Sequence, residues 1–101
     1  MTSRAATKIL SVDMATCRFL VHGRVQGVGY RYYALRAAEQ LGVAGFARNL
    51  PDGSVEVVAE ASGTALDEFE ARLRSGPSFA QVTDVAKSPL TPRGDQGFHI
   101  R

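Results

Sequence analysis

Residues 23–31, Gly-Arg-Val-Gln-Gly-Val-Gly-Tyr-Arg, decide how the rest of this sequence is interpreted. Three glycines fall within seven residues, just after the apolar run Phe19-Leu20-Val21 and just before a segment with helical spacing. Because glycine lacks a Cβ atom, such a loop can turn several backbone N–H groups toward one point. Converging N–H groups at the start of a helix bind anions, and phosphate most commonly. The stretch therefore predicts a strand, an anion-binding loop and a helix in succession.

Arg31 places a permanently charged, planar guanidinium at the start of the predicted helix. Helical side chains lean toward the helix N-terminus, so we expect Arg31 to bend toward the loop. Two other glycine-rich phosphate loops are excluded by their spelling. A Walker A loop ends in Gly-Lys-Ser/Thr, and this tripeptide does not occur in the chain. A dinucleotide fingerprint that began at Gly27 would need glycine at position 32, where the chain has Tyr32.

Apolar spacing on both sides of the loop gives the order of the remaining elements. Strands are predicted at 17–23, 43–50, 54–61, 81–87 and 97–101, and helices at 30–41 and from Thr64 to the Gly76-Pro77 stop. Gly42 is placed to end the first helix, and Thr64–Asp67 resembles a capping box that opens the second. The order βαββαβ predicts an α+β fold, a ferredoxin-like split βαβ sandwich. Its mixed, mainly antiparallel sheet carries two helices on one face.

This topology predicts where the chemistry lies. The first two strands run in the same direction, so the glycine loop after the first strand and Asn49 near the end of the second should meet at one rim. The strand at 54–61 alternates, with its valines on one face and Glu56 and Glu60 on the other. We interpret Glu56 as a surface carboxylate of this strand and Asp52 as a carboxylate of the turn before it, rather than as a catalytic pair.

Size and composition describe one ordinary globular domain. The chain has 101 residues, of which 45% are hydrophobic and 22% charged, and it has no apolar run of the roughly 20 residues that a membrane helix needs. We expect a flexible N-terminal extension over residues 1–16 and one folded domain over residues 17–101. Because the chain has a single cysteine, Cys17, it cannot form an intrachain disulfide, and this favours a reducing, cytoplasmic setting. Two weaker alternatives are a disulfide between two chains through Cys17 and an organelle-targeting role for the N-terminal extension.

Charge is unevenly distributed along the chain. Up to Arg36 there are six basic residues and one acidic residue, whereas residues 37–72 hold seven acidic and two basic ones. The loop end of the first helix should therefore be electropositive and attract an anionic substrate, although solvated surface charge without function would give the same count.

Two motifs together resemble the acylphosphatase family. Residues 23–31 match its signature Gly-x-Val-Gln-Gly-Val-x-Phe/Tyr-Arg, and Gly45–Val55 is similar to its second motif, an aromatic residue after glycine followed by a basic residue and asparagine. Shorter matches lie at Leu41-Gly42, Gly76-Pro77 and Gly97–Arg101, so the resemblance spans about residues 17–101. Tyr30, Ala34 and Ala47 depart from the commonest spelling, and none of them removes a proposed catalytic group.

The resemblance implies hydrolysis of an acyl phosphate to a carboxylate and inorganic phosphate, with phosphate also acting as a competitor. It implies that Arg31 binds the phosphoryl group and that Asn49 orients the attacking water; on residue type alone, these would be a surface arginine and a turn asparagine. The backbone expected to hold the other phosphate oxygens belongs to Arg24, Val25, Gln26, Gly27, Val28, Gly29 and Tyr30. We expect no cofactor, no metal, no nucleic-acid or membrane partner, and a monomer.

Two other functions remain open from the sequence. A non-catalytic anion-binding or regulatory module would use the same fold, although it need not keep both Arg31 and Asn49. An RNA-binding ferredoxin-like domain would fit the isoelectric point of about 9.0, but it needs exposed aromatic residues on a central strand, and residues 54–61 have none. His22 and His99 lack the partners of a catalytic triad and, with Cys17, are too few for a metal site.

Overall fold

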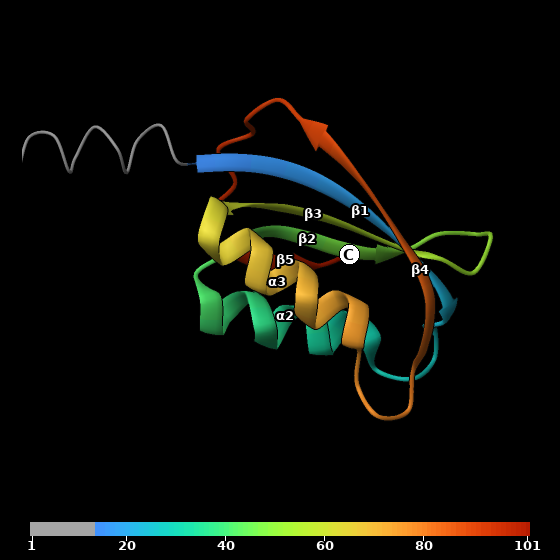
Figure 1. Ribbon diagram of the computed structural model, residues 1–101. Coiled ribbons are helices and arrows are strands. Elements are labelled where there is room, and N and C mark those ends of the chain that lie inside the picture. Colours follow the sequence, from blue (N-terminus) through green and yellow to red (C-terminus); the bar gives the residue numbers. More distant parts are fainter. Residues whose placement is uncertain (1–13) are drawn as a thin grey trace, which may run out of the picture.

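The computed structural model describes residues 14–101, in which one five-stranded sheet carries two helices on one face (Figure 1). The strands are β1 (Met14–Arg24), β2 (Ala44–Asn49), β3 (Val55–Ser62), β4 (Gln81–Leu90) and β5 (Phe98–Ile100), and the helices are α2 (Tyr30–Leu41) and α3 (Gly63–Ser75). The strand order is β4-β1-β3-β2-β5, and every pairing is antiparallel except that of β2 with β5. The predicted ferredoxin-like α+β fold is confirmed.

The register of β3 shows that β1 and β2 end at one rim. Val55, the first residue of β3, pairs with Val21 of β1 on one side and with Asn49 of β2 on the other. Both neighbours run antiparallel to β3, so both approach this rim at their C-terminal ends. The glycine loop that follows β1 and the asparagine that ends β2 are therefore brought together by strand pairing alone.

Aromatic side chains join the helices to the sheet. Phe69 of α3 packs edge-on against Phe19 of β1 and Phe98 of β5, with ring centroids 6.4 and 5.9 Å apart. Tyr30, the first residue of α2, is buried in the same core and donates a hydrogen bond of 2.6 Å to the carbonyl oxygen of Leu73. This contact joins the start of α2, next to the glycine loop, to α3.

Two strands are longer than predicted. β1 begins at Met14, so residues 14–16 of the predicted extension belong to the sheet, and residues 1–13 lie outside the described residues. β4 continues to Leu90 through Pro89. Proline is tolerated here because β4 is an edge strand, where a missing N–H need not break the ladder.

The predicted start of α3 was wrong. The cap is Ser62 rather than Thr64: the Ser62 backbone is extended, and its Oγ accepts a hydrogen bond of 3.2 Å from the N–H of Ala65. The helix therefore begins at Gly63, one residue before the predicted box. Ser62 thus satisfies the N–H of Ala65, whereas a cap at Thr64 would have accepted from the N–H of Asp67.

The face of the sheet opposite the helices is also covered. The alternation of β3 is as predicted, yet Glu56 and Glu60 are only 6% and 9% exposed. Residues 91–97 cross this face from β4 to β5, and Glu60 accepts hydrogen bonds from the Thr16 hydroxyl and from the N–H groups of Arg93 and Gly94. These contacts lower the pKa of Glu60, with the Thr16 bond contributing most.

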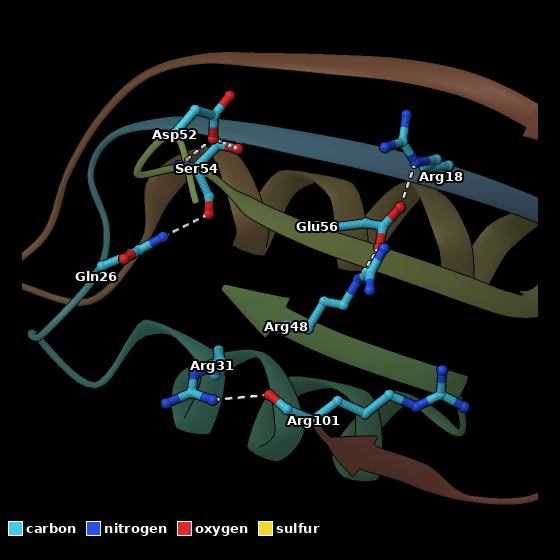
Figure 2. Close-up of polar contacts among 8 residues, drawn as sticks. All are labelled: Arg18, Gln26, Arg31, Arg48, Asp52, Ser54, Glu56 and Arg101. Carbon is cyan, nitrogen blue, oxygen red and sulfur yellow. Dashed lines mark hydrogen bonds and ion pairs between the residues drawn. The ribbon is translucent and has the colours of Figure 1, made fainter. Parts of the chain in front are cut away.

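Glu56 holds a second polar cluster on the same face. Its two carboxylate oxygens accept hydrogen bonds of 2.5 Å from Arg18 of β1 and Arg48 of β2 (Figure 2). Burial alone would raise the pKa of Glu56, but the bonds from the two arginines outweigh it and lower the pKa. Glu56 thus links three neighbouring strands and has no free oxygen for chemistry at the rim.

Candidate active site

The loop between β1 and α2 is open to solvent on the side where a ligand would lie. Gly27 and Gly29 have φ values of 76° and 77°, a region in which side chains are strained. A Cβ atom added at either position would meet nothing within 4 Å. Glycine is therefore needed here for backbone conformation, and the space beside it is empty of protein atoms.

The other side of the loop is firmly anchored. Val25 is buried in the core and Val28 packs against the core. The Gln26 side chain donates two hydrogen bonds of 2.8 Å, to the carbonyl oxygens of Leu50 and Ser54 (Figure 2 shows the second). Since Leu50 directly follows Asn49, Gln26 fixes the glycine loop against the turn that carries this asparagine.

The start of α2 favours an anion. Gly29 is the N-cap and has no side chain with which to cap the first N–H groups, and the first turn holds no acidic residue. The uncapped N–H groups and the helix dipole leave a partial positive charge at this end. Arg31 adds a full positive charge within the same turn.

The residue that follows β5 holds Arg31 in position. One Nη atom of Arg31 donates a hydrogen bond of 2.8 Å to the carbonyl oxygen of Arg101 (Figure 2). Arg101 is itself fixed to β2, because its N–H bonds the Ala47 carbonyl oxygen at 2.9 Å and its guanidinium lies 4.0 Å from the Phe46 ring centroid. This anchor leaves the remaining N–H donors of Arg31 available at the rim.

One cavity of about 210 Å³ joins these elements. Its lining residues are Val25, Gly27, Gly29, Tyr30, Arg31, Tyr32, Asn49 and Ile100. The structure thus brings the glycine loop, Arg31 and Asn49 together. Among the predicted phosphate-binding positions, Arg24, Gln26 and Val28 are not among the residues that line this cavity.

Sequence reasoning missed the contribution of the last strand. Ile100 lines the cavity and Arg101 holds Arg31, although 70 residues separate the two arginines. The available signal was the match of Gly97–Arg101 to the acylphosphatase pattern, to which no role was given. Tyr32, which in the sequence serves only to exclude a dinucleotide fingerprint, lines the cavity as well.

The titratable groups near the rim are engaged elsewhere. Burial, with a smaller effect of Tyr33, raises the pKa of the Tyr30 phenol, which stays protonated and bonds Leu73. Asp52 accepts hydrogen bonds from the hydroxyl and N–H of Ser54, and these bonds lower its pKa within the turn after β2. Among residues 14–101, no carboxylate or imidazole lines the cavity, and no group of three or more His, Cys, Asp or Glu residues is arranged to hold a metal ion.

Comparisons with known proteins point to one family. The acylphosphatase family model matches residues 17–100. The chain is 52% identical over 83 residues to an acylphosphatase of Alkalilimnicola ehrlichii, covering 82% of this chain and 93% of that protein. It is 51% identical over 81 residues to one from Thermus thermophilus, covering 80% and 92%. The crystal structure of acylphosphatase from Bacillus subtilis superposes with a TM-score of 0.84 at 36% identity, covering 87% of this chain and 98% of that one.

Proposed function

The chain belongs to the acylphosphatase family and hydrolyses acyl phosphates, and we propose that Arg31 and the glycine loop bind the phosphoryl group while Asn49 positions the attacking water. The observation that carries this assignment is the shared cavity: loop glycines, the helix arginine and the strand asparagine line one space. No part of the chain needs to move far for the three to act on one small substrate.

Binding of the phosphoryl group is assigned to backbone and guanidinium donors. The loop from Gly27 to Gly29 and the uncapped start of α2 supply N–H groups, and Arg31 supplies a charged fork that can bond two oxygens at once. Donors that are already in place stabilise charge as it moves onto the phosphoryl oxygens in the transition state. The bond from Arg31 to Arg101 supports this assignment, because it fixes the guanidinium before substrate arrives.

Asn49 orients the nucleophile rather than activating it as a base. Its carboxamide oxygen accepts a hydrogen bond from water, and its NH₂ group donates to a phosphoryl oxygen. A water held in line with the breaking P–O bond removes much of the entropic cost of bringing two reactants together. The position of Asn49 at the end of β2, in the cavity that the loop glycines also line, supports this role.

The chemistry proceeds without a strong protein base. Water oxygen forms the new P–O bond while the bond from phosphorus to the carboxylate oxygen breaks, and the carboxylate leaves with its electron pair. The water proton passes to an oxygen of the substrate's own phosphoryl group. Because a carboxylate is a good leaving group, the step needs neither a general acid nor a metal, and positioning with charge stabilisation is sufficient.

We also propose that the protein works as a cytoplasmic monomer. The single cysteine, Cys17, is buried on β1, which favours a reducing setting. No helix within residues 14–101 is long and apolar enough to cross a membrane. Inorganic phosphate, the product, should compete with substrate for the loop.

Phosphate release from benzoyl phosphate tests this assignment, measured with and without EDTA and with inorganic phosphate as the competitor. We expect turnover that EDTA does not change. Arg31→Ala should raise the inhibition constant of phosphate about tenfold or more, because a charge-assisted hydrogen bond is lost. Arg74→Ala, which removes an arginine paired with Glu70 on the other helix, is the matched control and should change neither quantity.

Two results would overturn the assignment. If Arg31→Ala bound phosphate as tightly as the unaltered chain, the phosphoryl group would not lie in this cavity. A folded sample that bound phosphate but released none from benzoyl phosphate would favour the non-catalytic anion-binding module instead.

A further inference from the structure

We propose that Tyr32 and Ile100 form an acyl-binding ledge that selects acyl phosphates with an aromatic or bulky apolar acyl group. The proposal rests on the function assigned above, because it concerns the other half of the same substrate. The ledge is defined by these two side chains, one from the first turn of α2 and one from β5.

Both residues are unusually exposed for their type. Tyr32 is 56% exposed and Ile100 is 39% exposed, yet both line the cavity that holds Arg31 and Asn49. Ile100 pairs with Ala47 on β2, which places it at the rim where β2 ends. When a ligand covers apolar side chains that otherwise contact water, the complex is stabilised.

The lining of the cavity places the acyl group on this ledge. The cavity is lined by the proposed phosphate-binding groups, Gly27, Gly29 and Arg31, and by the two exposed apolar side chains of the ledge. Since the phosphoryl group is held by the loop and Arg31, the carbons of the acyl group must extend outward to the mouth, where the exposed apolar side chains lie.

The chemistry of the mouth favours apolar over charged acyl groups. Arg31 is the only charged residue that lines the cavity in the described part of the chain, and the phosphoryl group engages it. The Arg36 guanidinium lies 5.2 Å from the centroid of the Tyr32 ring, a cation–π contact that restrains the ring. A restrained, half-exposed ring offers a surface against which a second aromatic ring can pack.

The test compares kcat/KM for benzoyl phosphate and acetyl phosphate across four variants. Tyr32→Ala should lower the benzoyl-to-acetyl ratio about fivefold, the effect of one aromatic contact. Tyr32→Phe, which keeps the ring, should retain the ratio. Ile100→Ala should lower it about twofold. Leu90→Ala, at the opposite end of the sheet and with a similar exposure of 37%, is the matched control and should leave it unchanged.

The inhibition constant of inorganic phosphate separates this proposal from the proposed function. It should stay within about twofold in all four variants, because phosphate has no acyl group. If Tyr32→Ala lowered kcat/KM equally for both substrates, or if succinyl phosphate, with its distal carboxylate, were preferred over benzoyl phosphate, the ledge would be refuted while the phosphate site stood. If the unaltered chain hydrolysed neither substrate, the proposed function itself would fail.

Discussion

The glycine loop and the sheet use the same residue for opposite reasons. Gly27 and Gly29 in the loop, and Gly23 and Gly45 in the strands, all have positive φ values, of 76°, 77°, 124° and 140°. A Cβ atom at either loop position would meet empty space. At the strand positions it would overlap the backbone of the neighbouring strand.

The difference separates residues needed for folding from residues needed for the site. Sheet glycines let two strands approach closely, so the fold depends on them. Loop glycines let the backbone take a left-handed path, and we propose that the N–H groups of this loop bind the phosphoryl group. Polar side chains divide in the same way: Glu56 and Glu60 of the sheet are buried and fully engaged, whereas Asn49 at the rim is exposed.

The largest effect is expected for Gly45→Ala. The new Cβ atom would overlap the carbonyl oxygen of Val58 on β3, and paired backbone cannot move aside as a side chain can. We expect the free energy of unfolding to fall by about 3 kcal/mol or more, measured by urea denaturation. Gly27→Ala, at a position with open space, should cost about 1 kcal/mol. Equal losses in the two variants would remove the distinction between sheet and loop glycines.

A smaller effect on the sheet is expected for Glu60→Gln. Glutamine keeps the shape but loses the charged acceptor for Thr16 and for the crossover backbone, at a cost of about 2 kcal/mol near neutral pH. The folded pKa of Glu60 is lowered, so its contribution is complete above the ordinary value of 4.5 and falls away as pH drops from there through the lowered pKa.

The measurement is urea denaturation of both proteins between pH 7 and pH 3. The difference between them should be constant above about pH 5 and shrink on acidification. Glu56, whose pKa is also lowered, will make both proteins less stable in acid, so it is the difference that counts. A difference that grew in acid would mean that Glu60 does not hold the crossover as a carboxylate.

The smallest effect on stability, and the most informative one on binding, is expected for Gly29→Ala. Gly29 and Gly42 flank α2 with nearly the same φ, 77° and 71°, and both positions have open space for a Cβ atom. Each alanine variant should lose about 1 kcal/mol of stability. Only Gly29→Ala should weaken phosphate binding, by about tenfold, because only Gly29 borders the cavity. Equal losses of phosphate affinity would show that helix stability, and not loop geometry, controls binding.

Much of the fold was predictable because local patterns and topology agree. Helical spacing between the Tyr30 start and the Gly42 stop gave the bounds of α2, and the βαββαβ order gave the meeting of the loop with Asn49. The ends of β1 and β4 were not predicted, since residues 14–16 precede the apolar run of β1 and proline, as at Pro89, is rare inside a strand. Their places depend on an acceptor from β3 and on an edge position in the sheet.

The meeting of the loop glycines, Arg31 and Asn49 in one cavity was predicted, whereas the distant contacts that hold them were missed. Glycines and an arginine within nine residues predict a phosphate loop, but nothing local says that Gln26 bonds the turn after Asn49 or that Arg101, after β5, bonds Arg31. The burial of Glu56 and Glu60 was missed for the same reason. A half-polar strand predicts one solvated face, but residues 91–97 cover Glu60, and Arg18 and Arg48 cover Glu56.

The most direct test of the central claim, that loop and strand form one site with divided roles, is Asn49→Ala. The kcat for benzoyl phosphate and the inhibition constant of inorganic phosphate are measured on the same sample. We predict that kcat falls about 100-fold or more while the inhibition constant stays within about threefold, because the loop and Arg31 still bind phosphate but no group aligns the water. Unchanged kcat, or loss of phosphate binding in step with turnover, would contradict the account.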